Sequence, residues 1–385
     1  MAGGVRRRDN LRPRGAESKR VIPSRTASRE QRRRGPTRIV QVMIRNASVS
    51  AAPAPPPAAA QHLPFDDAAS LVTRLDDEIG RVIIGQREVR REILACLFAG
   101  GHCLLRGVPG LAKTLLIKTL ADAVQLDFNR IQFTPDLMPS DILGTEVIED
   151  DGVAGKRHVR FIPGPVFANI ILADEINRTP PRTQAALLEA MQEYQVTVGG
   201  KRYELHRPLF VLATENPIEQ EGTYPLPEAQ LDRFMFNVVI EYPDAQDERR
   251  ILAETTTSAQ HSVRHVATGA ELESARLLVR ELPAAANVVD YALRLVRATR
   301  PNDPSAPQPV REWVRWGVGP RAGQSLLLGA KAWAMLDGRT VPAPEDVTRV
   351  ALPVLRHRVL VNYQAEADGV SPDAVIAKLL DAVRP

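Results

Sequence analysis

The sequence predicts an α/β fold with a parallel β-sheet, followed by a smaller domain that contains only helices. Three apolar runs of strand length begin near residues 102, 170 and 209, and each ends in polar residues. Helix-forming stretches separate these runs, as expected for parallel strands joined by helical crossovers. After residue 244 the pattern changes to helical periodicity, which predicts helices at 244–256, 270–281, 287–299, 320–335 and 344–350.

Composition divides the chain into a tail, an α/β core and a helical domain. Residues 1–64 are rich in Arg, Ser, Pro and Ala, and such a segment cannot bury enough apolar surface to offset ordering. We therefore expect a disordered tail, although its Arg-rich, acid-poor character also suits an organellar transit peptide and Met43 is an alternative start. Residues 65–243 form the expected core, and residues 244–385 form the helical domain.

A glycine-rich loop joins the first strand to the next helix. The loop and the start of the helix are Gly107, Val108, Pro109, Gly110, Leu111, Ala112, Lys113, Thr114 and Leu115. A helix N-terminus favours anions, so this segment predicts a phosphate site for ATP. Lys113 would reach the outer phosphates, and the Thr114 hydroxyl would bind Mg²⁺. Ala112 stands where such a loop usually has its second glycine, and a plain turn with a solvated lysine is the alternative.

Polar residues follow the second and third strands. Asp174 and Glu175 end the second strand, and Asn216 follows the third. Ligands of a parallel sheet bind at the carboxyl ends of its strands, so these side chains would arrive beside the phosphates. Asp174 would hold Mg²⁺, directly or through water, Glu175 would act as general base, and Asn216 would orient the attacking water. An acidic helix start and an Asn-Pro turn are the alternatives.

Several motifs occur in an order and spacing that resemble a known family, the MoxR-type AAA+ ATPases. They are Gly107 to Thr114, Ala173-Asp174-Glu175-Ile176-Asn177-Arg178, Leu187-Leu188-Glu189-Ala190-Met191, Thr214-Glu215-Asn216-Pro217 and Leu231-Asp232-Arg233-Phe234. The resemblance runs from about Phe65 to the C-terminus. It implies a P-loop (AAA+) core with a helical lid, in a hexameric ring of the helix-2-insert branch that is related to magnesium chelatase ATPase subunits. Members of the family act as chaperone-like remodellers.

The resemblance assigns a role to each residue that matches a motif of the family. Lys113 and Thr114 match Walker A, Asp174 and Glu175 match Walker B, and Asn216 matches sensor 1.

Two arginines and one further segment also match. Arg233 corresponds to the arginine finger, which would reach the ATP of the neighbouring subunit; a surface ion pair with Asp232 or Glu228 is the alternative. Arg321 corresponds to sensor 2, although Gly319 stands where the family usually has a serine. Gly85-Gln86 resembles the segment beside the adenine.

Two hairpins fit the same branch of the family. Short strands at 144–148 and 158–162 flank a polar stretch, and Gly199-Gly200 lies between two alternating runs. Both hairpins could be decorations of a sheet edge. The resemblance instead places them near the pore of the ring, where Lys201 and Arg202 are candidate substrate contacts.

The charge distribution argues against nucleic acid as the partner. Residues 1–46 hold 14 Lys and Arg against three acids, whereas the remainder holds 36 against 43. A basic footprint is thus confined to the tail. Cys96 and Cys103 lack partners at metal-binding spacing, which favours reduced core positions in a cytoplasmic protein, and no stretch has the ~20 apolar residues of a membrane span.

Two other sequence features favour structural roles. Trp313 and Trp316, three residues apart, are typical of core positions and could brace the turn into Arg321. The run Arg356-His357-Arg358 places cations near a helix end, with His357 at a structural or surface position.

The function that these features predict is Mg-ATP hydrolysis used to remodel or mature a partner protein. The resemblance implies a partner with a von Willebrand factor A domain. The alternative is an ATP-dependent motor or regulator that acts on nucleic acid, which the acidic folded part disfavours. A nucleotide-dependent scaffold with little turnover is a third possibility, disfavoured because Glu175, Asn216 and Arg233 are all present.

Overall fold

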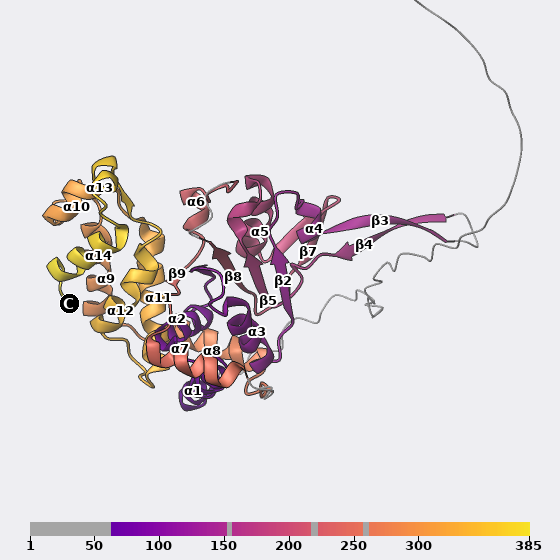
Figure 1. The fold of residues 1–385 in the computed structure, drawn as a ribbon, viewed down its shortest axis with the longest axis horizontal. Coiled ribbons are helices and arrows are strands. Elements are labelled where there is room, and N and C mark those ends of the chain that lie inside the picture. Colours follow the sequence, from indigo (N-terminus) through magenta and orange to yellow (C-terminus); the bar gives the residue numbers. More distant parts are fainter. Residues whose placement is uncertain (1–62, 152–155, 217–221, 257–261) are drawn as a thin grey trace, which may run out of the picture. The chain divides into compact units, whose positions relative to one another are not determined.

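The computed structural model describes residues 63–385 apart from 152–155, 217–221 and 257–261. The predicted tail lies outside these residues except for its last two positions, and so does Pro217 of the sensor 1 motif. The described residues from 63 onward form an α/β part and a helical part within one compact unit (Figure 1).

The α/β part has a central sheet with helices on both sides. Its helices are α1 (Phe65–Val82), α2 (Arg87–Phe98), α3 (Lys113–Ala123), α4 (Pro139–Leu143), α5 (Pro181–Glu193) and α6 (Glu228–Leu231), with the 3-10 helix η1 (Ile176–Arg178). Its central strands are β1 (Cys103–Arg106), β2 (Phe128–Gln132), β5 (Ile170–Asp174), β8 (Phe210–Glu215) and β9 (Phe236–Val239).

The five central strands are parallel, in the order β2-β5-β8-β1-β9. The predicted α/β fold is therefore confirmed. The strand of the glycine-rich loop, β1, lies between β8 and β9, so its carboxyl end opens beside those of β8 and β5. Strands β5 and β8 are buried along their whole length, which explains their continuous apolar runs.

Two hairpins extend the α/β part. Strands β3 (Gly144–Asp151) and β4 (Lys156–Pro163) form a projecting ribbon (Figure 1), and β6 (Gln195–Val198) pairs with β7 (Lys201–Glu204). Each strand of the first hairpin is longer than the sequence predicted, because pairing continues into the polar stretch, where Glu149 accepts a hydrogen bond from Arg160. The rings of Phe161 and Tyr203 stack with centroids 3.9 Å apart and join the two hairpins.

The helical part begins with two helices that contact the α/β part and continues as a lid. The elements are α7 (Ala245–Thr255), α8 (Gly269–Glu281), α9 (Ala286–Ala298), α10 (Gln308–Trp313), β10 (Val314–Trp316), α11 (Pro320–Leu336), α12 (Pro344–Leu355), β11 (Leu360–Val361), α13 (Tyr363–Ala367) and α14 (Pro372–Ala382). Helix α12 continues beyond the predicted residue 350, because its apolar residues through Leu355 are buried.

The structure corrects the expectation for Trp316 and selects the structural alternative for His357. Trp316 is 69% exposed, because it lies on the small two-stranded ribbon of β10 and β11 and not in the core. His357, in contrast, is buried and contacts the α/β part.

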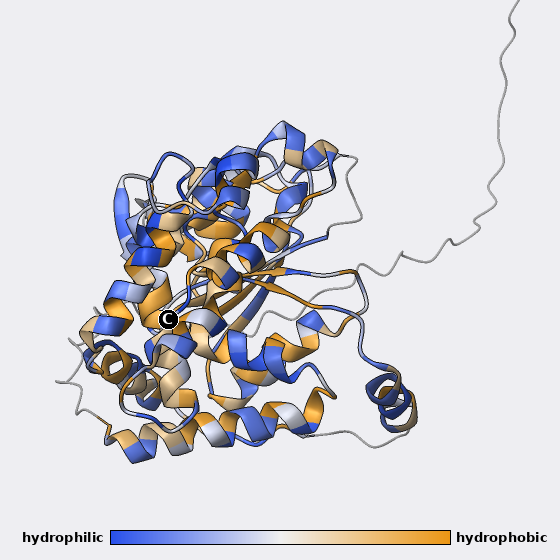
Figure 2. Ribbon diagram, turned by 90° about the vertical axis from the view of Figure 1, so that its left-hand side faces the viewer, coloured by the Kyte–Doolittle hydropathy of each residue, from blue (hydrophilic) through white to orange (hydrophobic). Residues whose placement is uncertain are grey.

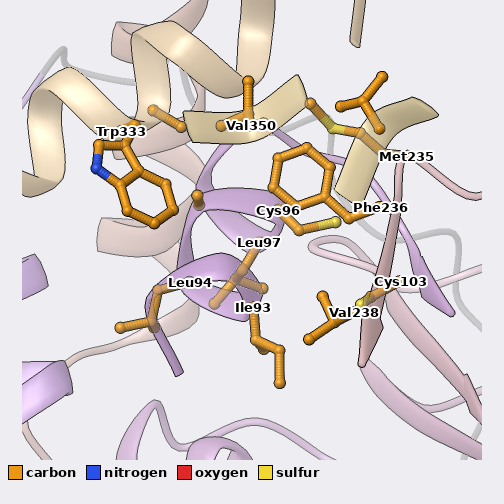
Figure 3. Packing of buried hydrophobic residues seen from close by; sticks show 14 of the residues in the cluster. Ile93, Leu94, Cys96, Leu97, Cys103, Met235, Phe236, Val238, Trp333 and Val350 are labelled. Carbon is orange, nitrogen blue, oxygen red and sulfur yellow. The ribbon is translucent and has the colours of Figure 1, made fainter. Parts of the chain in front are cut away.

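Apolar side chains from both parts form one continuous cluster. Apolar residues line the strands and the inward faces of the helices (Figure 2). Figure 3 shows Ile93 and Leu97 of α2, Phe236 of β9, and Trp333 and Val350 of the lid within this cluster. Cys96 and Cys103 belong to the same cluster as fully buried free thiols. The lid is thus held against α2 and β9 by burial of apolar surface.

Candidate active site

The glycine-rich loop has the backbone geometry of an anion site. Gly110 and Ala112 both adopt left-handed conformations, with φ of 89° and 55°, and Ala112 is the N-cap of α3. No side chain caps this N-terminus, so its first amides point into the loop without a side-chain acceptor. Lys113 and Thr114 begin the helix. The loop can therefore receive a phosphate on backbone amides.

The Lys113 ammonium points back into this loop. Its Nζ donates a hydrogen bond to the Gly107 carbonyl at 2.7 Å. Burial lowers the pKa of Lys113, while the charges of Asp174 and Glu175 oppose that shift. Strand β1, which leads into the loop, and strand β5, which ends at Asp174, flank β8 in the parallel sheet, so the loop and the acid pair predicted from sequence lie at the same edge.

The register of the sheet places Asp174 beside Thr214. Ala173 pairs with Ala213, so the next residues of β5 and β8 lie side by side at the carboxyl edge. The Thr214 hydroxyl donates to Oδ1 of Asp174 at 2.6 Å, and Arg130 donates to Oδ2 at 2.6 and 3.0 Å. Asp174 is 9% exposed, and its carboxylate oxygens are hard ligands of the kind that Mg²⁺ prefers.

Glu175 is held in a strained backbone conformation at the end of the same strand. Its φ of 58° is left-handed, and its amide donates to the Thr214 hydroxyl at 2.8 Å. Its carboxylate accepts a hydrogen bond from Gln132 at 2.7 Å and pairs with Arg178 at 3.3 Å. Left-handed residues other than glycine are uncommon and gather at functional sites.

Asn216 lies directly after β8 at the same edge and is 6% exposed. The preceding residue, Glu215, pairs with Arg106 at 2.8 Å across β8 and β1. The end of β8 is thereby fixed beside the start of the loop. Loop, acid pair and Asn216 all lie at one edge of the sheet.

Two cavities adjoin the loop on its other side. Gly85 and Gln86 adopt consecutive left-handed conformations before α2. Gln86 lines a cavity of about 300 Å³ with Val239 and Tyr242, and the latter two also line a second cavity beside Gly107 and Val108. Within the described part of the chain, the buried Oε1 of Gln86 has no hydrogen-bond partner. An exocyclic amino group such as that of adenine would supply the missing donor.

Arg233 and Arg321 lie elsewhere, at the opposite edge of the sheet, where the parallel strands begin. Arg233 precedes β9, and the amide of Met235 binds the carbonyl of His102, which precedes β1. The Arg233 guanidinium donates to the Leu188 carbonyl at 2.8 Å. Arg321 pairs with Asp232 at 3.0 Å, and both arginines line a cavity of about 360 Å³.

Two residues at the site carried no distinct signal in the sequence, and a third, Thr214, was noted only as part of a motif. Arg130 and Gln132 occupy alternate positions of β2 and so point toward the same face, where they reach Asp174 and Glu175. Thr214 connects the two acids through its hydroxyl. The period-two placement of Arg130 and Gln132 on an edge strand is the one signal that could have indicated them.

Comparisons with known proteins bear on this arrangement. The family described as "ATPase family associated with various cellular activities (AAA)" matches residues 102–236, and the AAA lid domain matches residues 309–379. "Chaperone MoxR1" of Mycobacterium tuberculosis is 42% identical over 306 residues, which is 80% of each chain. The chain belongs to the MoxR family of AAA+ ATPases. "Protein MoxR" of Paracoccus denitrificans, at 30% identity, covers 78% of this chain and 91% of its own.

A solved structure supports the same family assignment. A crystal structure described as a candidate ATPase from Cytophaga hutchinsonii is 40% identical, with a TM-score of 0.77, over 83% of this chain and 96% of its own. This MoxR-family chain is thus an ATPase with an AAA core and a helical lid. Among the residues that the structure describes, no helix has the length and apolar character needed to cross a membrane.

Proposed function

We propose that this MoxR-family ATPase hydrolyses Mg-ATP at the carboxyl edge of its sheet and uses the energy to remodel or mature a partner protein. The observation that carries the proposal is that Lys113 turns into the loop after β1, while Asp174 and Glu175, joined through the Thr214 hydroxyl, lie at the end of β5 on the same edge of the sheet. The open N-terminus of α3 and the unpaired Oε1 of Gln86 support a nucleotide as the ligand.

Each side chain has a role that follows from its position. Lys113 would leave the Gly107 carbonyl and neutralise the outer phosphates. Thr114 and Asp174 would hold Mg²⁺, which when bound neutralises charge on the phosphates. Glu175 would accept the proton of the attacking water, and Asn216 would orient that water.

Arg233 and Arg321 would act on the nucleotide of a neighbouring subunit. Both lie at the amino edge of the strands, whereas the loop follows the carboxyl end of β1. The four residues of β1 alone separate these edges by roughly 13 Å at the usual rise per residue. An arginine at one edge and a phosphate site at the other favour a head-to-tail ring, and we propose a hexamer.

The proposed client is a protein with a von Willebrand factor A domain, and the proposed compartment is the cytoplasm. The chaperone name of a relative supports a protein client. The projecting β3–β4 hairpin and the exposed residues Lys201 and Arg202 are the candidate client contacts. Lys201 also pairs with Glu146 at 3.8 Å, which joins the second hairpin to the first.

The proposed chemistry is tested by two substitutions with different expected results. Lys113→Ala removes the charge that holds the outer phosphates, so ATP binding should be lost. Glu175→Gln removes only the base, so ATP should bind normally but turnover should fall by about 10² or more. Nucleotide binding is measured by calorimetry and turnover by phosphate release with Mg²⁺. ATP affinity of Lys113→Ala equal to that of the unmodified chain would refute the site.

A further inference from the structure

Three consecutive lid residues form hydrogen bonds with the segment that carries Arg233. Arg356, His357 and Arg358 follow α12. Arg356 donates to the Asn237 carbonyl at 3.1 Å, and Nε2 of His357 lies 3.0 Å from the Phe234 carbonyl. Burial lowers the pKa of His357, so its ring is neutral and Nε2 can donate to that carbonyl.

Arg358 makes the most extensive contacts of the three. Its guanidinium donates to Oδ1 of Asp232 at 2.8 Å, to the Phe234 carbonyl at 2.7 Å and to the Met235 carbonyl at 3.0 Å. It also binds the carbonyls of Asp232 and Val354. The side chain is only 4% exposed. A buried charge is costly unless it is paired and fully hydrogen-bonded, so these acceptors fix the guanidinium in one place.

Asp232 connects this buried arginine to an exposed one. Its Oδ1 binds Arg358, and its Oδ2 accepts a hydrogen bond from Arg321 at 3.0 Å. The Arg321 side chain is 51% exposed, so it can turn toward a neighbour without desolvating a core group. Arg233 directly follows Asp232 in the chain. All three arginines line the same cavity.

We propose that Arg358 is a positioning residue, which holds Asp232 and the following residues so that Arg233 and Arg321 face the neighbouring subunit. This inference rests on the proposed action of Arg233 in trans. Because Arg358 belongs to the lid and binds the backbone on both sides of Arg233, a shift of the lid that breaks its contacts releases both arginines together. The lid would thereby control hydrolysis in the next subunit.

The test uses Arg358→Met, which keeps much of the apolar stem but removes every donor. We expect ATP binding to be unchanged and kcat to fall roughly 10- to 100-fold, as for small misplacements of catalytic groups. The matched control is Arg276→Met, because Arg276 is also a buried arginine bound to a carbonyl and one carboxylate, those of Leu97 and Glu273, and none of its hydrogen bonds in the described part of the chain reaches residues 232–237. Arg358→Lys is the second variant, because it keeps the charge beside Asp232 but loses the branched contacts to the carbonyls.

Mixing Arg358→Met with Lys113→Ala subunits then tests whether Arg358 acts on the site of the neighbouring subunit or on the site of its own subunit. Lys113→Ala subunits keep the native Arg358, Arg233 and Arg321. In a 1:1 mixture about a quarter of the interfaces of a head-to-tail ring pair an intact loop with an intact Arg358, so activity should rise well above that of either parent. Arg358→Lys should be rescued in the same way if Arg358→Met does not fold.

The outcomes distinguish this inference from the proposed function. A kcat for Arg358→Met and Arg358→Lys equal to that of Arg276→Met would overturn the positioning role. Failure of Lys113→Ala to rescue either Arg358 variant, while it rescues Arg233→Ala, would also overturn it. If Arg233→Ala is not rescued either, the action in trans itself is refuted, and the positioning role is refuted with it.

Discussion

Ala112 occupies a backbone conformation that alanine rarely adopts. Its φ is 55°, and Gly110, two residues earlier, is at 89°. Left-handed backbone costs alanine roughly 1 kcal/mol relative to glycine. We expect Ala112→Gly to stabilise the nucleotide-free protein by about 0.5–1 kcal/mol, as measured by urea unfolding.

The opposite change two residues away is the matched control. A Cβ added at Gly110 would meet no atom within 4 Å, so Gly110→Ala introduces backbone strain without a clash. It should destabilise the protein by about 1 kcal/mol. Shifts of the same sign in both variants would contradict the strain argument.

Arg130 binds the Asp174 carboxylate, which we propose as a ligand of Mg²⁺. It donates two hydrogen bonds to Oδ2, the oxygen not bound by Thr214. Arg130→Met removes that positive charge and frees the oxygen. We expect the Mg²⁺ concentration for half-maximal ATPase activity to fall several-fold, because a free carboxylate attracts the cation more strongly.

An arginine that is remote from the site controls for the change in net charge. Arg160 lies on the projecting hairpin and pairs with Glu149 at 3.1 Å. Arg160→Met should leave the Mg²⁺ titration unchanged. Identical curves for the two variants would show that Arg130 does not act on Asp174.

At the residue scale, the contacts of Arg130 could not be predicted from the sequence. The sequence predicted Lys113 after β1 and Asp174 and Glu175 at the end of β5, because a loop and a strand end are local patterns, and their roles in catalysis stay a prediction. Arg130 reaches Asp174 only because Gln132 of β2 pairs with Asp174 of β5, and register across a crossover depends on the whole sheet.

At the scale of elements, Glu78 of α1 is hydrogen-bonded to the segment that leads into α8. It is 1% exposed and accepts hydrogen bonds from the Arg264 amide at 2.9 Å, from the Arg264 side chain at 2.8 Å and from Arg81 at 2.9 Å. Burial raises the pKa of Glu78, but these bonds outweigh it and lower the pKa to about 2. The carboxylate therefore contributes to stability only while it is ionised.

Glu78→Gln should lower stability by about 2 kcal/mol at pH 7, the usual contribution of hydrogen bonds to a charged group. The folded pKa lies below the ordinary value of 4.5, so the stabilisation is complete above 4.5 and is lost as pH falls toward 2. The difference in Tm between the two proteins should thus be smaller at pH 3 than at pH 7. Asp67→Asn, at an exposed acid of the same helix, controls for loss of a charge; an equal Tm difference for Glu78→Gln at both pH values would contradict the prediction.

The elements themselves were largely predictable from periodicity, but their partners were not. The buried strands β5 and β8 and the lid helices α9 and α11 lie where the apolar patterns placed them. The order of the strands in the sheet became known only from the structure, because β8 lies between β1 and β5 although β5 precedes it in the chain. The exposed Trp316 shows the same limit, since a small ribbon at the surface cannot be distinguished from core by spacing alone.

At the scale of the whole molecule, the positions of the proposed site residues at two edges of the sheet support our proposal that two subunits form one complete site. The loop, Asp174 and Glu175 lie at one edge, and Arg233 and Arg321 lie at the other. A single chain cannot bring them together without rebuilding its sheet. In the proposed ring, the carboxyl edge of one subunit would therefore meet the amino edge of the next.

Arg233→Ala should accordingly bind ATP almost normally but hydrolyse it roughly 10³- to 10⁵-fold more slowly, the usual contribution of an arginine finger. Lys113→Ala should fail for the opposite reason, since its loop is defective and its Arg233 is intact. A mixture of the two variants should recover activity, because some interfaces join the intact loop of one chain to the intact arginine of the other. An isologous dimer would pair the edges differently. If size analysis shows mixed oligomers and phosphate release stays at the level of the parents, Arg233 does not act on a neighbouring nucleotide.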